Sequence, residues 1–229
     1  MTETGLLIGT ALFIALTHTL IGVDHYVPFI ALSKSNNWTL KKTILIVLLC
    51  GIGHVLGSVI LGIVGITISA NISALINVEN LRGTFAAYVL VAFGLVYTIY
   101  GLRAAIKNIS HSHIGQDGKS FTHTHGFGVT EHQHKKNNAL WGLFIFFVLG
   151  PCEPLIPILM YPAATMNIFT IVMVTICFAV VTISVMLFMT ILGLKGLQLL
   201  KPGKFARYAH AIAGSVILLC GIALLTLPV

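Results

Sequence analysis

Residues 166–194 read MNIFTIVMVTICFAVVTISVMLFMTILGL, a run of twenty-nine residues without a charged side chain. An α-helix rises ~1.5 Å per residue, so about twenty residues cross the ~30 Å hydrocarbon core of a bilayer. This run is therefore long enough and apolar enough to span a membrane as a helix.

The composition of the whole chain agrees with a membrane setting. Hydrophobic residues make up 57% of the 229 residues and charged residues 8%, whereas roughly a quarter of the residues in a soluble domain are charged. These values exclude an ordinary soluble protein and also a disordered chain, which is polar and highly charged. The 13 basic residues are too scattered to form a phosphate-tracking patch, so the expected partner is the lipid bilayer and no nucleic acid.

Apolar runs separated by short polar breaks predict an all-α polytopic membrane protein with six transmembrane helices. The predicted helices lie near residues 5–32, 43–69, 83–106, 139–162, 166–194 and 208–228.

Six spans also suggest two halves of three helices, residues 1–106 and 139–229, joined by a hydrophilic segment at 107–138. The stretch from Gly22 to Pro28 resembles the stretch from Gly150 to Pro157, since in both a Gly is followed by polar groups and then Pro. An odd number of spans in each half would invert the second half relative to the first, which is a recurring plan in transporters.

The distribution of Lys and Arg predicts the orientation, because cytoplasmic loops are enriched in basic residues. With six spans, only Arg82 falls on one side of the membrane. The other twelve fall on the opposite side: Lys34, Lys41, Lys42, Arg103, Lys107, Lys119, Lys135, Lys136, Lys195, Lys201, Lys204 and Arg207. We therefore expect a multi-pass cell-membrane protein with both termini outside and the 107–138 segment in the cytoplasm.

Two acidic residues, Asp24 and Glu153, fall inside predicted spans. The other four acids are assigned to termini or loops, namely Glu3, Glu79, Asp117 and Glu131. A charge at the centre of a membrane helix costs ~2.5–3.5 kcal/mol even on insertion scales, so buried acids are candidates for function. No Lys or Arg is expected deep in a span to neutralise Asp24 or Glu153.

Histidines accompany these acids, since His18, His25 and His54 also fall inside predicted spans. Imidazole, thiolate and carboxylate together suit a first-row transition metal better than Mg²⁺ or Ca²⁺. Cys152 lies beside Glu153 in a proline-rich stretch that should distort the helix and expose carbonyls. The predicted intramembrane metal site therefore comprises His18, Asp24, His25, His54, Cys152 and Glu153.

The spacing of His18 and His25 leaves two arrangements open. Seven residues of straight helix separate them by ~10.5 Å, while two nitrogens on one ion lie at most ~4.2 Å apart. Either the helix breaks at Gly22 or near Pro28 and folds one histidine back, or the two histidines serve successive ions along a path.

The hydrophilic segment at 107–138 contains three His-x-His pairs. In an extended chain alternate side chains point the same way, so each pair could chelate one ion. A secondary site for metal capture is predicted at His111, His113, His123, His125, His132 and His134.

The stretch from Leu16 to His25, which carries His18 and then Asp24-His25, resembles the signature of the nickel/cobalt transporter superfamily. The resemblance is greatest to the UreH-like branch of urease-accessory membrane proteins. Gly53-His54 resembles the next motif of that family, and Pro151-Cys152 resembles a Pro-Cys-Pro step in related efflux proteins. The resemblance implies a secondary transporter of a divalent metal, Ni²⁺ or Co²⁺ first and then Zn²⁺ or Fe²⁺, carried as cargo without a permanent cofactor. A cytosolic metallochaperone is the protein partner that this role implies.

Other functions are kept as alternatives. A membrane thiol-redox carrier would use Cys152, but it needs a second cysteine, and the matching position in the first half is Asp24. A sulfite-exporter-like anion transporter would need an embedded Lys or Arg. An intramembrane metalloenzyme would carry His-Glu-x-x-His, which is absent from the sequence, so no enzyme activity is expected.

Overall fold

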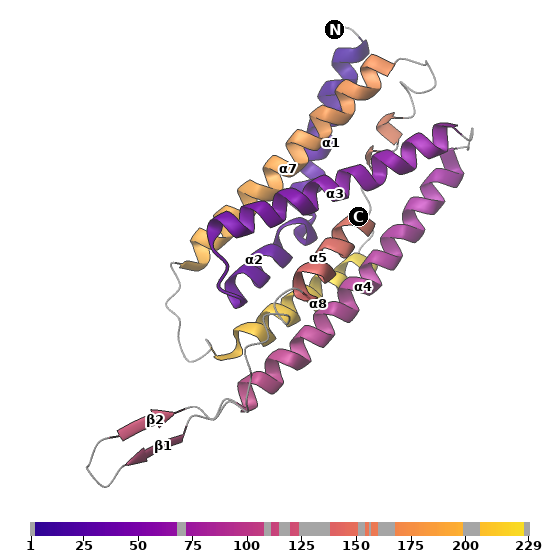
Figure 1. The fold of residues 1–229 in the computed structure, drawn as a ribbon. Coiled ribbons are helices and arrows are strands. Elements are labelled where there is room, and N and C mark those ends of the chain that lie inside the picture. The colour runs from indigo at the N-terminus through magenta and orange to yellow at the C-terminus, as the bar shows by residue number, and fades with distance from the viewer. Residues whose placement is uncertain are drawn as a thin grey trace.

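The computed structural model describes residues 3–67, 72–107, 111–114, 120–123, 138–150, 154–155, 157–159, 168–198 and 207–226. The elements in chain order are α1 (Glu3–Ile21), a 3-10 turn η1 (Val23–His25), α2 (Val27–Ser35), α3 (Leu40–Thr67), α4 (Ile72–Lys107), β1 (His111–Ile114), β2 (Ser120–His123), α5 (Asn138–Leu149), α7 (Ile168–Gln198) and α8 (Ala209–Thr226). Figure 1 shows an elongated bundle of helices with the two strands projecting from one end.

Five helical segments in the described part of the chain are long and apolar enough to cross a membrane. They are Glu3–Ile21, Leu40–Val64, Ile76–Ile106, Ile168–Gln198 and Ala209–Thr226. The chain is thus an integral, multi-pass, helical membrane protein, as the sequence predicted. The predicted span at 139–162 is represented by the shorter apolar helix Leu140–Leu149 and by residues 154–155 and 157–159.

The first predicted span, 5–32, is not one helix. It is divided into α1, η1 and α2, with the break between Ile21 and Val27. The predicted span at 83–106 begins earlier than expected, because α4 starts at Ile72. Both differences bring polar side chains into the bundle, as described below.

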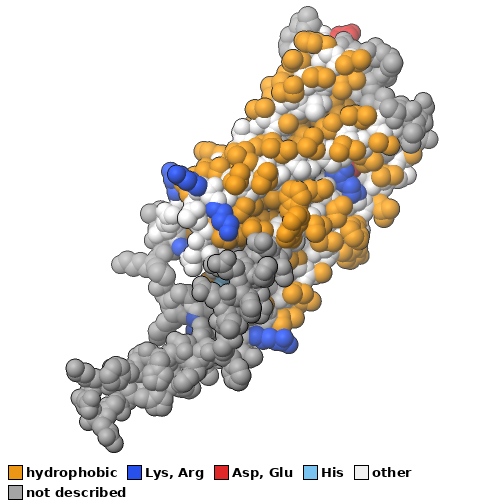
Figure 2. Space-filling model, in the orientation of Figure 1, with side chains coloured by type: hydrophobic (Ala, Val, Ile, Leu, Met, Phe, Trp, Pro, Cys, Tyr) orange, Lys and Arg blue, Asp and Glu red, His pale blue; other side chains and the backbone are white. Residues whose placement is uncertain are grey.

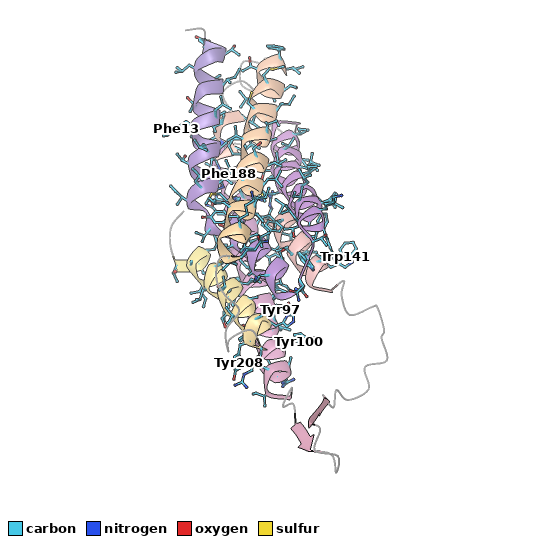
Figure 3. The ribbon with its side chains drawn as sticks, turned by 90° about the vertical axis from the view of Figure 1, so that its left-hand side faces the viewer. Phe13, Tyr97, Tyr100, Trp141, Phe188 and Tyr208 are labelled. Carbon is cyan, nitrogen blue, oxygen red and sulfur yellow. The ribbon has the colours of Figure 1, made fainter. Side chains whose placement is uncertain are left out.

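The outer surface of the bundle is apolar. Figure 2 shows hydrophobic side chains covering most of the visible face. Phe13 and Phe188, which are labelled in Figure 3, are 66% and 63% exposed. A soluble protein rarely exposes such a continuous apolar surface, but lipid chains would cover it here.

The interior holds two groups of packed side chains. One surrounds the stacked rings of Phe29 and Phe147, whose centroids lie 4.6 Å apart. The other lies where Ala11 and Ala15 of α1 allow close approach to Phe178 of α7. The first group includes Phe29 of α2 and the second includes Ala15 of α1, so the two groups lie on either side of the helix break along the chain.

The helices α4 and α8 pack through small residues. A β-carbon at Gly94 or Gly101 of α4 would collide with the backbone of α8, and one at Gly214 or Gly221 would collide with α4. Without a hydrophobic driving force in lipid, such close backbone contact is a main source of helix association. Gly94 lies opposite Leu218 and Gly101 opposite Ala211, so the two helices run antiparallel.

The strands β1 and β2 form an antiparallel pair within the predicted loop. His111 is opposite His123 in this register, and His113 is opposite Phe121. The remaining histidines of the predicted capture segment, at 125, 132 and 134, lie outside the described residues.

Candidate metal site

The break in the first span folds the chain back on itself. The helix α1 ends at Ile21, and Gly22 takes a non-helical backbone conformation with φ −70° and ψ 87°. The turn is stabilised by bonds from Gly22 N to His18 O (2.9 Å) and from His25 N to Gly22 O (3.0 Å). Pro28, at the beginning of α2, lacks an N–H and so loses nothing by lying in the first turn of a helix.

This turn brings three histidines together. One ring nitrogen from each of His18, His25 and His54 lies within 4.8 Å of the other two. The His25 ring is the central one, because its centroid lies 4.9 Å from that of His18 and 5.1 Å from that of His54. His18 lies in the last turn of α1, His25 ends η1, and His54 comes from the middle of α3. Of the two arrangements that the sequence left open, the structure has the folded one.

One ring nitrogen of each of the three histidines is available. His25 Nδ1 lies 3.1 Å from Gly22 O, and His54 Nδ1 lies 3.3 Å from Phe147 O. The Nε2 atoms of His18, His25 and His54 are buried and have no hydrogen-bond partner in the described part of the chain. A ring that donates from Nδ1 to a carbonyl keeps its lone pair on Nε2, which is the usual state of a metal-binding histidine.

The three nitrogens fit one transition-metal ion closely. Metal–nitrogen bonds of ~2.1 Å require ligating nitrogens to be at most ~4.2 Å apart. The three nitrogens lie within 4.8 Å of one another, so small rotations of the rings would bring them to the distance that one ion requires. Burying three unsatisfied imidazole nitrogens without a ligand would cost free energy, because buried polar atoms are normally bonded. This geometry can hold an ion with three protein ligands and an open position.

Asp24 lies beside this group rather than within it. Its Oδ1 is 3.3 Å from His25 Nδ1, on the side of the ring opposite the free Nε2. Among the described residues its carboxylate meets His25 and no Lys or Arg. Predicted from sequence as a metal ligand, Asp24 is placed by the structure to orient His25 and to supply negative charge near the site.

The helix α4 carries a basic residue, Arg82, that pairs with an acid of the same helix. Arg82 lies within the span Ile76–Ile106, where its Nη1 is 3.0 Å from Oε2 of Glu79. Glu79 was assigned to a loop from the sequence but is buried in α4. The predicted span began near residue 83, just beyond both residues, whereas α4 begins at Ile72.

The ion pair fixes the end of α5. Arg82 donates from Nε to Leu149 O (3.0 Å) and from Nη2 to Gly150 O (2.7 Å), and Ser58 bridges Arg82 and Glu79. These carbonyls have no helical partner at the end of a helix, so a cation there is favourable. The neighbouring carbonyl of Phe147 accepts from His54, and the Arg82 contacts therefore hold the element that orients His54.

Two residues of the predicted site, at 152 and 153, lie outside the described residues, as do several histidines of the predicted capture segment. The three cysteines that the structure describes, Cys50, Cys177 and Cys220, are free thiols. Cys50 and Cys220 are buried in the apolar core, as expected of small hydrophobic residues.

The sequence named Gly22 as a possible break in the helix, but it did not show that Gly22 supports the His25 ring or that the Phe147 carbonyl supports His54. Gly22 is required beneath the His25 ring, because a β-carbon there would lie 2.5 Å from His25 Nδ1. The carbonyl of Phe147 belongs to a helix that lies 93 residues from His54 in the sequence. The position of Gly22, three residues before a buried His, was a local signal for its role. No local signal exists for the role of the Phe147 carbonyl.

Comparison with known proteins places the chain in a different group from the one its first motif suggested. Residues 25–223 match the family described as cytochrome C biogenesis protein transmembrane region. No curated protein and no solved structure matches the chain. The resemblance to nickel/cobalt transporters is thereby overturned, and with it the prediction of a Ni²⁺ or Co²⁺ transporter. The short motif around His18 and Asp24-His25 misled because it covers ten residues, whereas the family match covers most of the chain.

Proposed function

The chain belongs to the cytochrome C biogenesis transmembrane family, and on that premise we propose that it is a membrane redox protein whose reactive centre is a metal ion held by His18, His25 and His54. The observation that carries the proposal is the convergence of three buried imidazoles whose Nε2 atoms have no partner among the described residues. The family match supports a redox role, and the histidine geometry supports a metal as the group that performs it.

Copper is the ion that suits the proposed centre best. Imidazole ligands suit zinc, copper, iron and nickel, and affinity for such sites peaks at Cu²⁺. Copper also changes oxidation state by one electron, so an ion at this site could accept an electron from one partner and pass it to another. In this proposal the ion is resident, and it replaces the metal cargo expected from the sequence.

Thiol chemistry is the second candidate, since the family match favours the alternative of a thiol-redox carrier. Two cysteines must meet for a disulfide to form, and the three that the structure describes are free. A pair involving Cys152 would be required. The experiment below separates the two chemistries.

A repeat of two inverted halves is part of the proposal. The repeat would match α1 with α5, α3 with α7 and α4 with α8. Exchanging the halves then turns the contact between α1 and α7 into the contact between α5 and α3, and it leaves the contact between α4 and α8 unchanged. The glycines at the contact have the same spacing in both helices. Gly94 and Gly101 of α4 face α8, and Gly214 and Gly221 of α8 face α4. This agreement supports a two-fold axis between the third helices of the two halves.

The positions of the helix ends support six crossings. Thr4 of α1 meets Thr170 of α7, so both helices begin at the same end of the bundle. The end of α4 lies beside the start of α8, where Gly101 faces Ala211. The start of α8 follows the end of α7 after ten residues. The segment between α4 and α7 must therefore pass from one end of the bundle to the other.

The same arrangement supports the proposed orientation. The basic ends of α4, α7 and the α2–α3 turn would face the cytoplasm together with the 107–138 segment, and both termini would lie outside. Figure 3 places Tyr97, Tyr100 and Tyr208 toward the end from which the strands project. Aromatic side chains at this level are typical of a membrane interface.

The test compares three variants in a strain that lacks the native gene. One variant carries His18→Ala, His25→Ala and His54→Ala, a second has all four cysteines replaced by Ala, and the third is the matched control Cys177→Ala. We measure copper per purified protein, the Cu²⁺ electron paramagnetic resonance signal, and the amount of c-type cytochrome with covalently bound haem. The proposal expects the histidine variant to lose all three signals and the cysteine-free variant to keep them. Loss of cytochrome in the cysteine-free variant, with full function in the histidine variant, would assign the activity to thiols.

A further inference from the structure

A second site lies at the opposite end of α2 from the histidines. A cavity of about 310 Å³ opens where α2 ends, α3 begins and α7 ends. Its lining includes Lys34, Asn37 and Trp38 from the α2–α3 connection and Leu194, Lys195 and Gln198 from α7. It shares no residue with the candidate metal site.

The cavity has a basic and an apolar side. Lys34 and Lys195 are its charged lining residues, and no Asp or Glu is among the described residues that line it. Leu40, Ile191 and Leu194 supply the apolar wall. A ligand that satisfies both sides carries a negative head and an apolar body.

The turn that forms one wall is fixed by the backbone. Asn37 has a left-handed conformation with φ 51°. Trp38 N donates to Ser33 O (3.0 Å) and Asn37 N to Lys34 O (3.4 Å), which is the Schellman pattern that ends a helix. The cavity is therefore preformed on one side rather than shaped by a ligand.

The aromatic residue in this turn is held in place as well. The Lys42 ammonium group lies 5.3 Å from the centroid of the Trp38 ring, within the range of a cation–π contact. Trp38 is partly buried, and its indole N–H remains a donor suited to a headgroup at the membrane interface.

We propose that this cavity binds a phosphate-bearing anion, and that its occupant in the membrane is the headgroup of an anionic glycerophospholipid. Lys34 and Lys195 would bind the phosphate, the amides of Asn37 and Gln198 would hydrogen-bond the headgroup, and the acyl chains would follow the apolar wall. Basic pockets between membrane helices on the cytoplasmic side bind anionic headgroups in this way. The occupant would join the α2–α3 turn to α7, which belong to different halves of the bundle.

The chain offers a built-in reporter for the test, because it contains two tryptophans, Trp38 and Trp141. Trp141 lies in α5 and is 61% exposed, so Trp141→Phe leaves Trp38 as the sole tryptophan with little effect on packing. The full-length variant is reconstituted into phosphatidylcholine vesicles that contain increasing fractions of brominated phosphatidylglycerol or brominated phosphatidylcholine. Bromine quenches indole fluorescence on contact.

We expect phosphatidylglycerol to reach half-maximal quenching at about a tenfold lower mole fraction than phosphatidylcholine. The double variant Lys34→Gln, Lys195→Gln should lose this preference. A control with the same loss of charge, Lys41→Gln and Arg103→Gln, removes exposed basic residues outside the cavity lining and should keep it.

Addition of millimolar inorganic phosphate identifies the source of the anion. Relief of quenching by phosphate assigns the cavity to free phosphate, and persistent quenching assigns it to the lipid. Equal quenching by the two lipids, or an equal loss of preference in the control variant, would overturn the proposal.

Discussion

The imidazole ring of His25 lies directly against the backbone of Gly22, so closely that a β-carbon at position 22 would lie 2.5 Å from Nδ1 and 2.9 Å from Cε1 of that ring. The same ring nitrogen is bonded to the carbonyl of Gly22. Gly22 therefore does two things at once: it ends α1 and provides the surface on which His25 is folded back.

This relationship makes Gly22→Ala a specific test of the metal site. The backbone angles of Gly22 are accessible to alanine, so the expected effect is displacement of His25 and not strain in the turn. We expect at least about tenfold weaker copper binding, because metal ligands must be held within ~0.5 Å. The matched control is Gly9→Ala in α1, where a β-carbon meets nothing within 4 Å. Equal copper affinity in the two variants would show that the His25 position does not depend on Gly22.

The role of Asp24 predicts a graded response to substitution. Asp24→Asn keeps the size of the side chain but removes the charge that faces His25 Nδ1. Supporting groups of this kind are worth ~10–100-fold in metal affinity. Copper titration of the purified protein should show a loss in this range, and His25→Ala should abolish binding. A complete loss in Asp24→Asn would instead indicate that the carboxylate is a direct ligand.

Removal of Arg82 should destabilise the protein as a whole. Arg82→Gln leaves Glu79 buried without its charge partner and frees the carbonyls of Leu149 and Gly150. Breaking one side of a buried ion pair costs ~3–5 kcal/mol. Thermal unfolding in detergent should therefore occur at a clearly lower temperature, whereas the control Arg103→Gln, at an exposed position, should unfold like the native protein. An unchanged unfolding temperature in Arg82→Gln would contradict a structural role for the pair.

The contact between α4 and α8 predicts a strong effect of small changes in size. Gly101→Val should force the helices apart, because a side chain there meets the backbone of His210 and Ala211. Overpacking typically costs ~1–3 kcal/mol, and rigid backbone contact places this site at the upper end. Limited proteolysis should cut the variant faster than the native protein. Gly196→Val is the control, since nothing lies within 4 Å of a β-carbon there, and equal proteolysis rates would contradict the packing.

The proposed topology can be tested in intact cells with an impermeant thiol reagent. In a cysteine-free background, a cysteine added after Val229 should be labelled, while Lys119→Cys should react only after the cells are permeabilised. Six crossings and the basic loops together require this result. Labelling of both positions without permeabilisation, or of neither, would mean that an even number of crossings, and not three, separates residue 119 from Val229.

The sequence by itself determined the membrane class and most of the helices. Long uncharged runs such as 166–194 fix a helix in lipid, because every backbone group must be bonded within its own segment. This physical rule acts locally, so it can be applied to the sequence without knowledge of the fold. The rule does not show which polar side chains become buried, as Glu79 does in α4 beside Arg82.

Only the tertiary structure decided what the buried polar residues form. The sequence identified His18, His25 and His54 as unusual, but it left open whether the first two meet. That depends on the turn at Gly22, and the place of His54 depends on α5, whose Phe147 carbonyl accepts from its ring. The sequence likewise grouped Asp24 with the ligands, since a list of residue types does not show which nitrogen of a ring a carboxylate faces. Contacts between segments distant in the chain arise from packing and leave no local pattern, and for this reason the arrangement of the site could not be predicted from residues alone.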